Sequence, residues 1–297
     1  MKILDGRKLR DHIKDKLKKE VGLLKNKPSL AIIQVGERVE SNAYIASKKK
    51  FAEVIGVGVI HKKFKEEIET KEIIAEIEKL NVNKEISGIL VQLPIPEKLD
   101  RECIMNAILP SKDVDGLGPV NVKKLFDGNP EAILPATTKG ILTLLEKNDI
   151  SIHGKNVLVI GRSSLVGKPT ALACLMRDAT VTIAHSKTQN LEKYTKTADI
   201  IIVAAGKKKL LTPSHVLPHQ VIIDVGINPD FVLNEKEISL ALQDEIPNRI
   251  LVGDVDFENI KDKVQAISPV PGGVGPMTVA SLFENVLIAH KRSFKTG

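Results

Sequence analysis

The segment "NVLVIGRSSLVGKPTALACL", residues 156–175, indicates the fold of the second half of the chain. An apolar strand runs into Gly161, a polar turn follows, and Gly167 opens a helix in which Pro169 suits the first turn. A turn of this kind presents backbone N–H groups and the positive end of a helix dipole to a phosphate. The segment therefore predicts a nucleotide-binding turn.

Two common phosphate-binding patterns do not fit this turn. A P-loop has four residues between its glycines and then Lys-Ser/Thr, whereas five residues separate Gly161 from Gly167 and Pro169 follows Lys168. The dinucleotide pattern G-x-G-x-x-G also fails, because Ser163 stands at its second glycine. The order of strand, glycine turn, helix and strand is kept, so a Rossmann-type arrangement is predicted, with an ordinary strand–helix turn as the alternative.

The segments around this turn alternate between strands and helices. Val/Ile-rich runs at 179–185, 199–206 and 221–226 predict further strands after it. Before it, helices are expected at 7–25 and 42–56 and strands at 28–36 and 86–96. The chain is therefore predicted to be an α/β protein of two domains with parallel sheets, divided near residues 120–145.

Composition argues against several classes of function. The chain has 297 residues and a net charge of +7, which favours an anionic partner, but aromatic residues make up 3% and Trp is absent. A base-stacking surface is poorly supplied, so no nucleic-acid partner is expected. Cys103 and Cys174 lie far apart, and the seven histidines form no ligand spacing, so neither a disulfide nor a metal site is predicted. The charged N-terminus and the lack of a long apolar run indicate a cytoplasmic protein without a membrane span.

The strand after the glycine turn indicates the kind of cofactor. NAD enzymes commonly place Asp or Glu about 20 residues after the turn, whereas "ATVTIAHSKT" (179–188) ends in His185, Ser186 and Lys187. Hydroxyl and cationic groups at this place suit a ribose phosphate, and Arg162 and Ser163 can add donors. NADP is favoured over NAD. The alternative is that Lys187 only solvates the strand end.

The segment "SNAYIASKKK" (41–50) places Tyr44 and Lys48 on one helical face. The alternative is an amphipathic surface helix with a solvated lysine run. Short-chain dehydrogenases share the Tyr-x-x-x-Lys spacing, but there the pair follows the glycine turn, whereas here it precedes the turn by more than a hundred residues. The pair is therefore expected on a second, substrate-binding domain.

Two further segments before the glycine turn carry candidate functional side chains. Gln92 interrupts the apolar run "GILVQLP", where a buried amide must find hydrogen-bond partners. Asp113 and Asp115 in "KDVDG" suit a turn, and a carboxylate such as that of Asp115 can also accept two N–H groups from a ligand.

Several segments together resemble the bifunctional methylenetetrahydrofolate dehydrogenase/cyclohydrolase (FolD) family, and the resemblance covers nearly the whole chain. The segments that resemble the family's motifs, in the family's order, are "VGERVESNAYIASKKK", "GILVQLPIP", "PSKDVDG", "VIGRSSLVGKP", "ATVTIAHSKT", "DVGIN", "VGDVDF" and "SPVPGGVGPMTVASL".

The resemblance implies a folate-binding catalytic domain at 1–140, completed by a C-terminal helix at 275–297, a Rossmann-type NADP-binding domain at 141–274 with a cleft between the two, and a homodimer. It implies oxidation of 5,10-methylenetetrahydrofolate and hydrolysis of the methenyl product. The implied catalytic residues are Lys48, Tyr44, Gln92 and Asp115, and the implied substrate contacts are Tyr44, Ser41, Asp115, Pro271, Gly272 and Gly273. The implied cofactor contacts are Gly161, Arg162, Ser163, Val166, Gly167, His185, Ser186, Lys187, Ala205, Gly206 and Ile227.

Lys48 is expected to have a pKa lowered by burial and to serve chiefly the cyclohydrolase step. The chain departs from the family at Gly118, where many relatives have His, and at Ala136 and Thr138, where Cys and Pro are usual. A shikimate-dehydrogenase-like oxidoreductase and a non-catalytic nucleotide-binding protein are the competing interpretations.

Overall fold

The computed structural model describes residues 1–229 and 251–294. These residues form two compact units. The large-sheet unit contains residues 1–11, 137–229 and 251–278, and the small-sheet unit contains residues 12–136 and 279–294. In the described part of the chain, the passages between the units fall within three helices, which are α1 (Gly6–Gly22), α6 (Ala136–Glu146) and α11 (Val274–Ser293).

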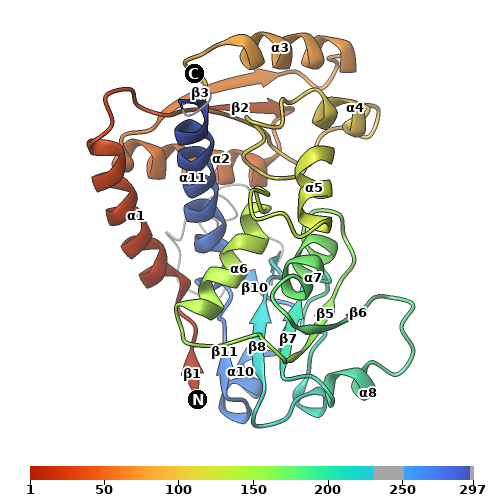
Figure 1. The fold of residues 1–297 in the computed structure, drawn as a ribbon. Coiled ribbons are helices and arrows are strands. Elements are labelled where there is room, and N and C mark those ends of the chain that lie inside the picture. The colour runs from red at the N-terminus through yellow and green to blue at the C-terminus, as the bar shows by residue number, and fades with distance from the viewer. Residues whose placement is uncertain (230–250, 295–297) are drawn as a thin grey trace. The chain divides into compact units, whose positions relative to one another are not determined.

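The large-sheet unit is built on six parallel strands in the order β1-β11-β8-β7-β5-β6 (Figure 1). The sheet pairs β5 with β6 on one side and with β7 on the other, so the order reverses at β5, and such a reversal is where open α/β sheets bind ligands. The strands are β1 (Lys2–Ile3), β5 (Asn156–Ile160), β6 (Thr180–Ala184), β7 (Ile200–Val203), β8 (Val221–Asp224) and β11 (Ala266–Ile267).

Short elements connect these strands. Helices α7 (Gly167–Leu175), α8 (Leu191–Thr195) and α10 (Phe257–Ile260) belong to this unit, with 3₁₀ turns at Pro213–His215 and Lys261–Lys263. An antiparallel pair, β9 (Asn228–Pro229) and β10 (Leu251–Val252), lies outside the large sheet.

The central strands of the large sheet are buried along their whole length, as their continuous Val/Ile runs predict for a sheet covered on both faces. The four strands predicted from 156–161, 179–185, 199–206 and 221–226 are confirmed as β5 to β8. By contrast, β1 and β11 have two residues each, which is too short for a periodic pattern to reveal.

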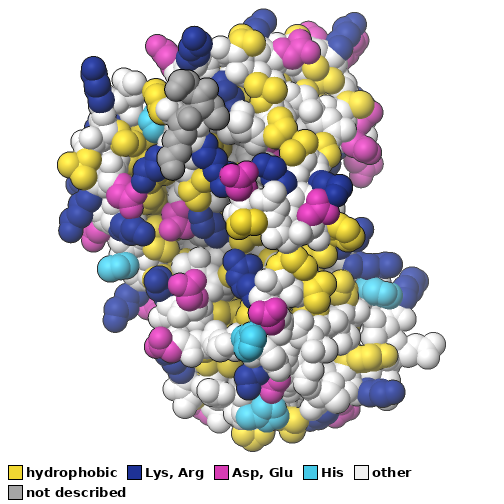
Figure 2. Space-filling view, viewed as in Figure 1, with side chains coloured by type: hydrophobic (Ala, Val, Ile, Leu, Met, Phe, Trp, Pro, Cys, Tyr) yellow, Lys and Arg dark blue, Asp and Glu magenta, His cyan; other side chains and the backbone are white. Residues whose placement is uncertain are grey.

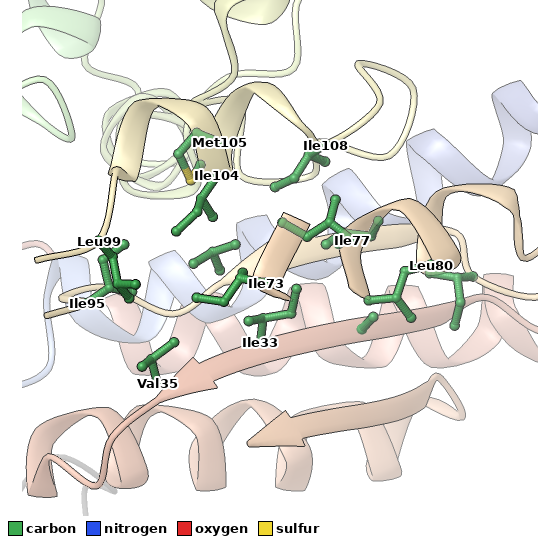
Figure 3. Close-up of a cluster of buried hydrophobic side chains, with 14 residues drawn as sticks. Ile33, Val35, Ile73, Ile77, Leu80, Ile95, Leu99, Ile104, Met105 and Ile108 are labelled. Atoms are coloured by element: carbon green, nitrogen blue, oxygen red, sulfur yellow. The ribbon is translucent and has the colours of Figure 1, made fainter. Parts of the chain in front are cut away.

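The small-sheet unit contains three parallel strands in the order β3-β2-β4. Figure 3 shows its core, where Ile33 and Val35 of β2 pack with Ile73, Ile77 and Leu80 of α3. The α3 residues recur at the spacing of one helical face, so this burial stabilises both layers. The elements are β2 (Ser29–Val35), α2 (Val39–Ile55), β3 (Gly58–Phe64), α3 (Thr70–Val82), β4 (Gly88–Val91), α4 (Arg101–Asn106) and α5 (Pro119–Phe126).

Two strands of this unit differ from the sequence predictions. The edge strand β3 reads "GVIHKKF", and its partly exposed polar residues hide the strand pattern. The predicted strand at 86–96 is shorter, because β4 ends at Val91. The domain limits 1–140 with 275–297, and 141–274, remain a prediction, while pairing with β11 places β1 in the large sheet.

Candidate active site

Helix α2 carries Ser41, Tyr44 and Lys48 at the spacing of one helical face. Lys48 is 8% exposed, whereas the neighbouring Lys49 and Lys50 are exposed. Of the three consecutive lysines, only Lys49 and Lys50 therefore face solvent. The first member points its ammonium into the protein, where an unpaired charge would be costly.

Gln92 supplies the partner that the Lys48 ammonium needs. The residue follows the last residue of β4, and its Oε1 accepts a hydrogen bond of 2.7 Å from Lys48 Nζ. Its Nε2 donates to the carbonyl oxygen of Leu93 at 2.8 Å, so both ends of the buried amide are satisfied. This confirms the expectation that a glutamine in the apolar run has specific partners.

Asp115 forms an electrostatic pair with Lys48. Burial lowers the pKa of Lys48 to about 8, and the negative charge of Asp115 opposes that shift. Burial raises the pKa of Asp115 to about 6, opposed by the Lys48 charge and by a backbone hydrogen bond from Ala136. Burial therefore brings both groups closer to their neutral forms, and a neutral amine becomes accessible near physiological pH.

Tyr44 lies half-buried one helical turn before Lys48. Burial raises the pKa of its phenol to about 12, and the charge of Glu40 adds to the shift. The phenol therefore stays protonated at physiological pH and presents a flat ring with one O–H donor.

Three residues that the sequence interpretation did not assign to the site fix the loop that carries Asp115. The buried Asp113 accepts hydrogen bonds from the Gly118 backbone N–H at 2.9 Å and from Asn121 Nδ2 at 2.8 Å. On α11, Asn285 Nδ2 donates to the carbonyl oxygens of Val114 and Leu134 at 3.0 and 2.9 Å. The "KDVDG" turn gave a signal for Asp113, but no motif pairs the loop with Asn285, 171 residues away.

The three departures from the family sequence are accommodated without disturbing these bonds. Gly118 and Ala136 contribute through their backbone N–H groups, to Asp113 and Asp115 respectively. The buried Thr138 shares a 2.9 Å hydroxyl hydrogen bond with Thr170 in the large-sheet unit.

The glycine turn follows β5, as predicted, and its glycines are required by close packing. Gly161 has φ +132°, and a Cβ there would lie 2.2 Å from the carbonyl oxygen of Ala204. A Cβ at Gly167 would lie 2.3 Å from the carbonyl oxygen of Gly161. Ser163 Oγ accepts the N–H groups of Val166 and Gly167 at 3.2 and 3.3 Å, which closes the turn, while Arg162 is exposed beside it.

The remaining predicted cofactor residues lie at the carboxyl ends of the neighbouring strands. His185, Ser186 and Lys187 follow β6, Ala205 and Gly206 lie just beyond β7, and Ile227 follows β8. Ser186, Lys187 and Arg162 are exposed, and no carboxylate stands directly after β6. These side chains fit a dinucleotide that carries an additional phosphate on its ribose.

The predicted substrate loop belongs to the large-sheet unit. Pro271 is half-buried and Gly272 and Gly273 are buried. The backbone N–H groups of Gly6 and Arg7 both donate to the Gly272 carbonyl oxygen, at 2.9 and 3.2 Å. The start of α1 thus fixes the loop before α11 begins at Val274.

Within residues 1–229 and 251–294, no three His, Cys, Asp or Glu side chains gather as metal ligands, and no helix has the length and apolarity to cross a membrane. On the face drawn in Figure 2, Lys and Arg side chains are dispersed among acidic ones.

Similar proteins support the resemblance seen in the sequence. A "Bifunctional protein FolD" of Acetivibrio thermocellus is 44% identical over 297 residues, covering 99% of this chain and 98% of the relative. The crystal structure of a FolD methylenetetrahydrofolate dehydrogenase/cyclohydrolase from Campylobacter jejuni matches with TM-score 0.90 and 38% identity, covering 99% of both chains. A Trypanosoma brucei FolD complexed with NADP cofactor and inhibitor matches with TM-score 0.90 and 34% identity over 98% of both chains.

A shikimate dehydrogenase from Aquifex aeolicus matches with TM-score 0.51 and 11% identity, covering 92% of this chain and 99% of that one, which shows a shared fold only. Residues 4–115 match the tetrahydrofolate dehydrogenase/cyclohydrolase catalytic domain, and residues 135–294 match the NAD(P)-binding domain of the same family. The chain therefore belongs to the tetrahydrofolate dehydrogenase/cyclohydrolase family.

Proposed function

We propose that this chain oxidises 5,10-methylenetetrahydrofolate to the 5,10-methenyl form with NADP and hydrolyses the product to 10-formyltetrahydrofolate. The observation that carries the proposal is the buried 2.7 Å hydrogen bond from Lys48 to Gln92, with Asp115 as the electrostatic partner of Lys48. All three residues lie in the part of the chain that matches the family's catalytic domain. The full-length relatives named bifunctional FolD support this function over a shikimate-dehydrogenase-like one.

NADP is the proposed cofactor, and the related Trypanosoma brucei structure contains it. In this chain the glycine turn supplies backbone N–H groups, and Arg162, Ser186 and Lys187 are the proposed contacts to the ribose phosphate. When bound, the cofactor supplies the hydride acceptor. The other predicted contacts are Gly161, Ser163, Val166, Gly167, His185, Ala205, Gly206 and Ile227.

The dehydrogenase step demands positioning more than proton transfer. A hydride leaves a carbon flanked by two nitrogens, and the resulting cation is shared between those nitrogens, so no proton is removed. Tyr44 can pack against the folate ring, and Asp115 can accept N–H groups from its edge. Ser41 and the loop residues Pro271, Gly272 and Gly273 are further proposed substrate contacts.

The cyclohydrolase step requires proton transfer. Water adds to the amidinium carbon, and a carbon–nitrogen bond then breaks; of the two water protons, one passes to the leaving nitrogen and one is released. Lys48 is placed to move these protons, because burial lowers its pKa to about 8. Gln92 directs the Lys48 Nζ through the 2.7 Å hydrogen bond.

A homodimer, which rests on the family resemblance, and a cytoplasmic location, as predicted from the sequence, complete the proposal. Size-exclusion chromatography with light scattering would test the dimer directly, with a monomer mass contradicting it.

The test of function is to mix the purified protein with methylenetetrahydrofolate and either NADP or NAD. Reduced cofactor and the methenyl intermediate are followed together by absorbance. Reduction with NADP and little methenyl accumulation would support both steps. Methenyl accumulation would contradict hydrolysis at Lys48, and no reduction with either cofactor would contradict the proposed function.

A further inference from the structure

Two buried aspartates lie at the carboxyl end of the large sheet, and neither has a role in the reactions proposed above. Asp224 is the last residue of β8 and is 2% exposed, and Asp254 follows β10 and is fully buried. A buried carboxylate is costly unless its oxygens are hydrogen-bonded, so the bonds of this pair indicate what it does.

Asp254 binds the segment just beyond β7. Its Oδ2 accepts the backbone N–H groups of both Ala205, at 2.7 Å, and Gly206, at 2.8 Å. Its Oδ1 accepts a hydrogen bond of 2.9 Å from Asn228 Nδ2. One carboxylate therefore connects the segment after β7 with the segment after β8, and charge-assisted hydrogen bonds of this kind are the stronger ones.

Asp224 in turn fixes the position of Asp254. Its Oδ1 accepts the backbone N–H groups of Asp254 at 2.9 Å and Gly226 at 3.0 Å, and its Oδ2 accepts that of Val255 at 2.9 Å. The main chain of Asp254 is thereby held against the end of β8, and its side chain is directed toward Ala205.

Two glycines make this arrangement possible. A Cβ at Gly226 would lie 2.3 Å from Asp254 Oδ1, and a Cβ at Gly253 would lie 1.7 Å from Asp224 Oδ2. Each aspartate thus packs against the glycine of the other segment. The runs "DVGIN" and "VGDVDF" are explained as two halves of one hydrogen-bonded network.

The network reaches the glycine turn through Ala204. The Ala204 N–H donates to the Ile160 carbonyl oxygen at 2.7 Å, and Gly161 packs so closely on the Ala204 carbonyl that a Cβ at Gly161 would lie 2.2 Å from it. A shift of the Ala205 and Gly206 backbone would therefore move the surface on which the glycine turn rests.

We propose that Asp254 is a positioning residue for the dinucleotide cofactor, setting the Ala205–Gly206 segment and the Ile227–Asn228 segment at the carboxyl ends of β7 and β8. This inference rests on the proposed function, because it assumes that these segments contact NADP. Asp254 itself is fully buried, so it acts through the Ala205 and Gly206 backbone and the Asn228 side chain that it binds, and not through contact with the cofactor.

The test compares Asp254→Asn with wild type in both half-reactions. The amide oxygen can still accept from Ala205 and Gly206, but its NH2 group then faces Asn228 Nδ2, and two donors oppose each other. We expect kcat/KM for NADP to fall roughly tenfold, mainly through KM, because misplaced binding groups lose contacts. Hydrolysis of methenyltetrahydrofolate without NADP is expected to stay within about twofold.

The double variant Asn228→Asp with Asp254→Asn exchanges donor and acceptor and should recover most of the NADP kcat/KM. Asp256→Asn is the matched control, because the Asp256 carboxylate accepts a hydrogen bond from Asn259 Nδ2 and pairs with Lys209 Nζ, whereas the Ala205 and Gly206 N–H groups donate to Asp254. The inference is overturned if Asp254→Asn keeps its NADP kcat/KM, if both half-reactions fall together, or if the exchange recovers nothing. A wild-type protein that reduces no NADP would instead contradict the proposed function.

Discussion

Each unit buries a pair of ionisable side chains, and the two pairs are stabilised differently. Lys48 and Asp115 carry opposite charges, and each opposes the shift that burial imposes on the pKa of the other. Asp224 and Asp254 carry like charges, and burial raises the pKa of Asp224 to about 7, with the Asp254 charge adding to the rise and backbone N–H groups opposing it.

The difference separates a reactive pair from a positioning pair. Among the described residues, the Lys48 ammonium donates a side-chain hydrogen bond to Gln92 Oε1, and an ammonium has three N–H donors, so Lys48 retains capacity for proton transfer to a substrate. The carboxylate oxygens of Asp224 and Asp254 each accept hydrogen bonds from backbone or amide donors of their own unit. Lys48 can therefore take part in proton transfer because it keeps unused donors. Asp224 and Asp254 instead fix the positions of the segments whose N–H groups they accept.

The largest expected effect is at the reactive pair. Lys48→Met should lower the rate of methenyl hydrolysis by roughly 10²- to 10⁴-fold, because it removes the proton-transfer group, while hydride transfer is lowered much less. Separate assays of the two half-reactions check this. Lys49→Met, at the exposed neighbouring position, is the control and should leave both rates near wild type. Equal loss of both activities in Lys48→Met, with folate binding intact, would contradict this division of roles.

The packing around Asp224 and Asp254 is expected to be disrupted by any added side-chain volume. Gly253→Ala would place a Cβ 1.7 Å from Asp224 Oδ2, so the free energy of unfolding should fall by about 1–3 kcal/mol or more. Denaturant unfolding measures the change. Gly22→Ala, where a Cβ meets nothing within 4 Å, should change stability by less than about 0.5 kcal/mol. If the two variants lowered the free energy of unfolding equally, the Asp224–Asp254 network would accommodate the added methyl group, which contradicts the prediction.

The pH profile of methenyl hydrolysis should report the charge pair. The neutral Lys48 amine is lost as the pH falls below about 8, and kcat/KM should fall with it. Gln92→Glu would place a negative charge at the acceptor of the 2.7 Å hydrogen bond, which raises the pKa of Lys48 and should move the midpoint upward by about one pH unit. Rates measured across this range check the shift, and an unchanged or lower midpoint would exclude Lys48 as the titrating group.

The smallest effect is expected at an exposed ion pair. Lys291 Nζ lies 2.7 Å from Glu20 Oε2, and this hydrogen bond lowers the pKa of the Glu20 carboxyl. Lys291→Ala should cost about 0.2–1 kcal/mol above the unfolded pKa of Glu20, and the difference should vanish as the pH falls through the folded pKa. Unfolding at low and high salt checks it, because an exposed pair weakens with salt. If Lys291→Ala lowered the free energy of unfolding more than Gly253→Ala does, the exposed ion pair would contribute more to stability than the buried network, contrary to this expectation.

Sequence patterns predicted most of the large sheet and less of the small one. Continuous apolar runs identify β5, β7 and β8, because a strand covered on both faces needs apolar residues at every position. The edge strand β3 carries His61, Lys62 and Lys63 and gives no such run. The short β1 and β11 depend on their neighbours in the sheet and have no local signal.

Candidate site residues could be predicted when their own sequence segment carries a recognisable pattern. The lysine spacing, the glutamine in an apolar run and the acidic turn mark Lys48, Gln92 and Asp115, and the resemblance identifies them as one set. No sequence pattern indicated the roles of Asn121, Asn285 and Asp254, because asparagine and aspartate in loops and helices often form only local hydrogen bonds.

By itself, the sequence determined the longer buried strands and the glycine turn, because these depend on local periodicity and on residue type, and its family resemblance implied the candidate catalytic side chains. Only the tertiary structure showed that Lys48 Nζ donates to Gln92 Oε1, and that Asp254 binds backbone groups 48 and 49 residues earlier in the chain. The physical reason is that burial and hydrogen bonding depend on which segments pack together. Strand pairing, not distance along the chain, brings these segments together, because β7 pairs with β8, and β10 pairs with β9, which follows β8.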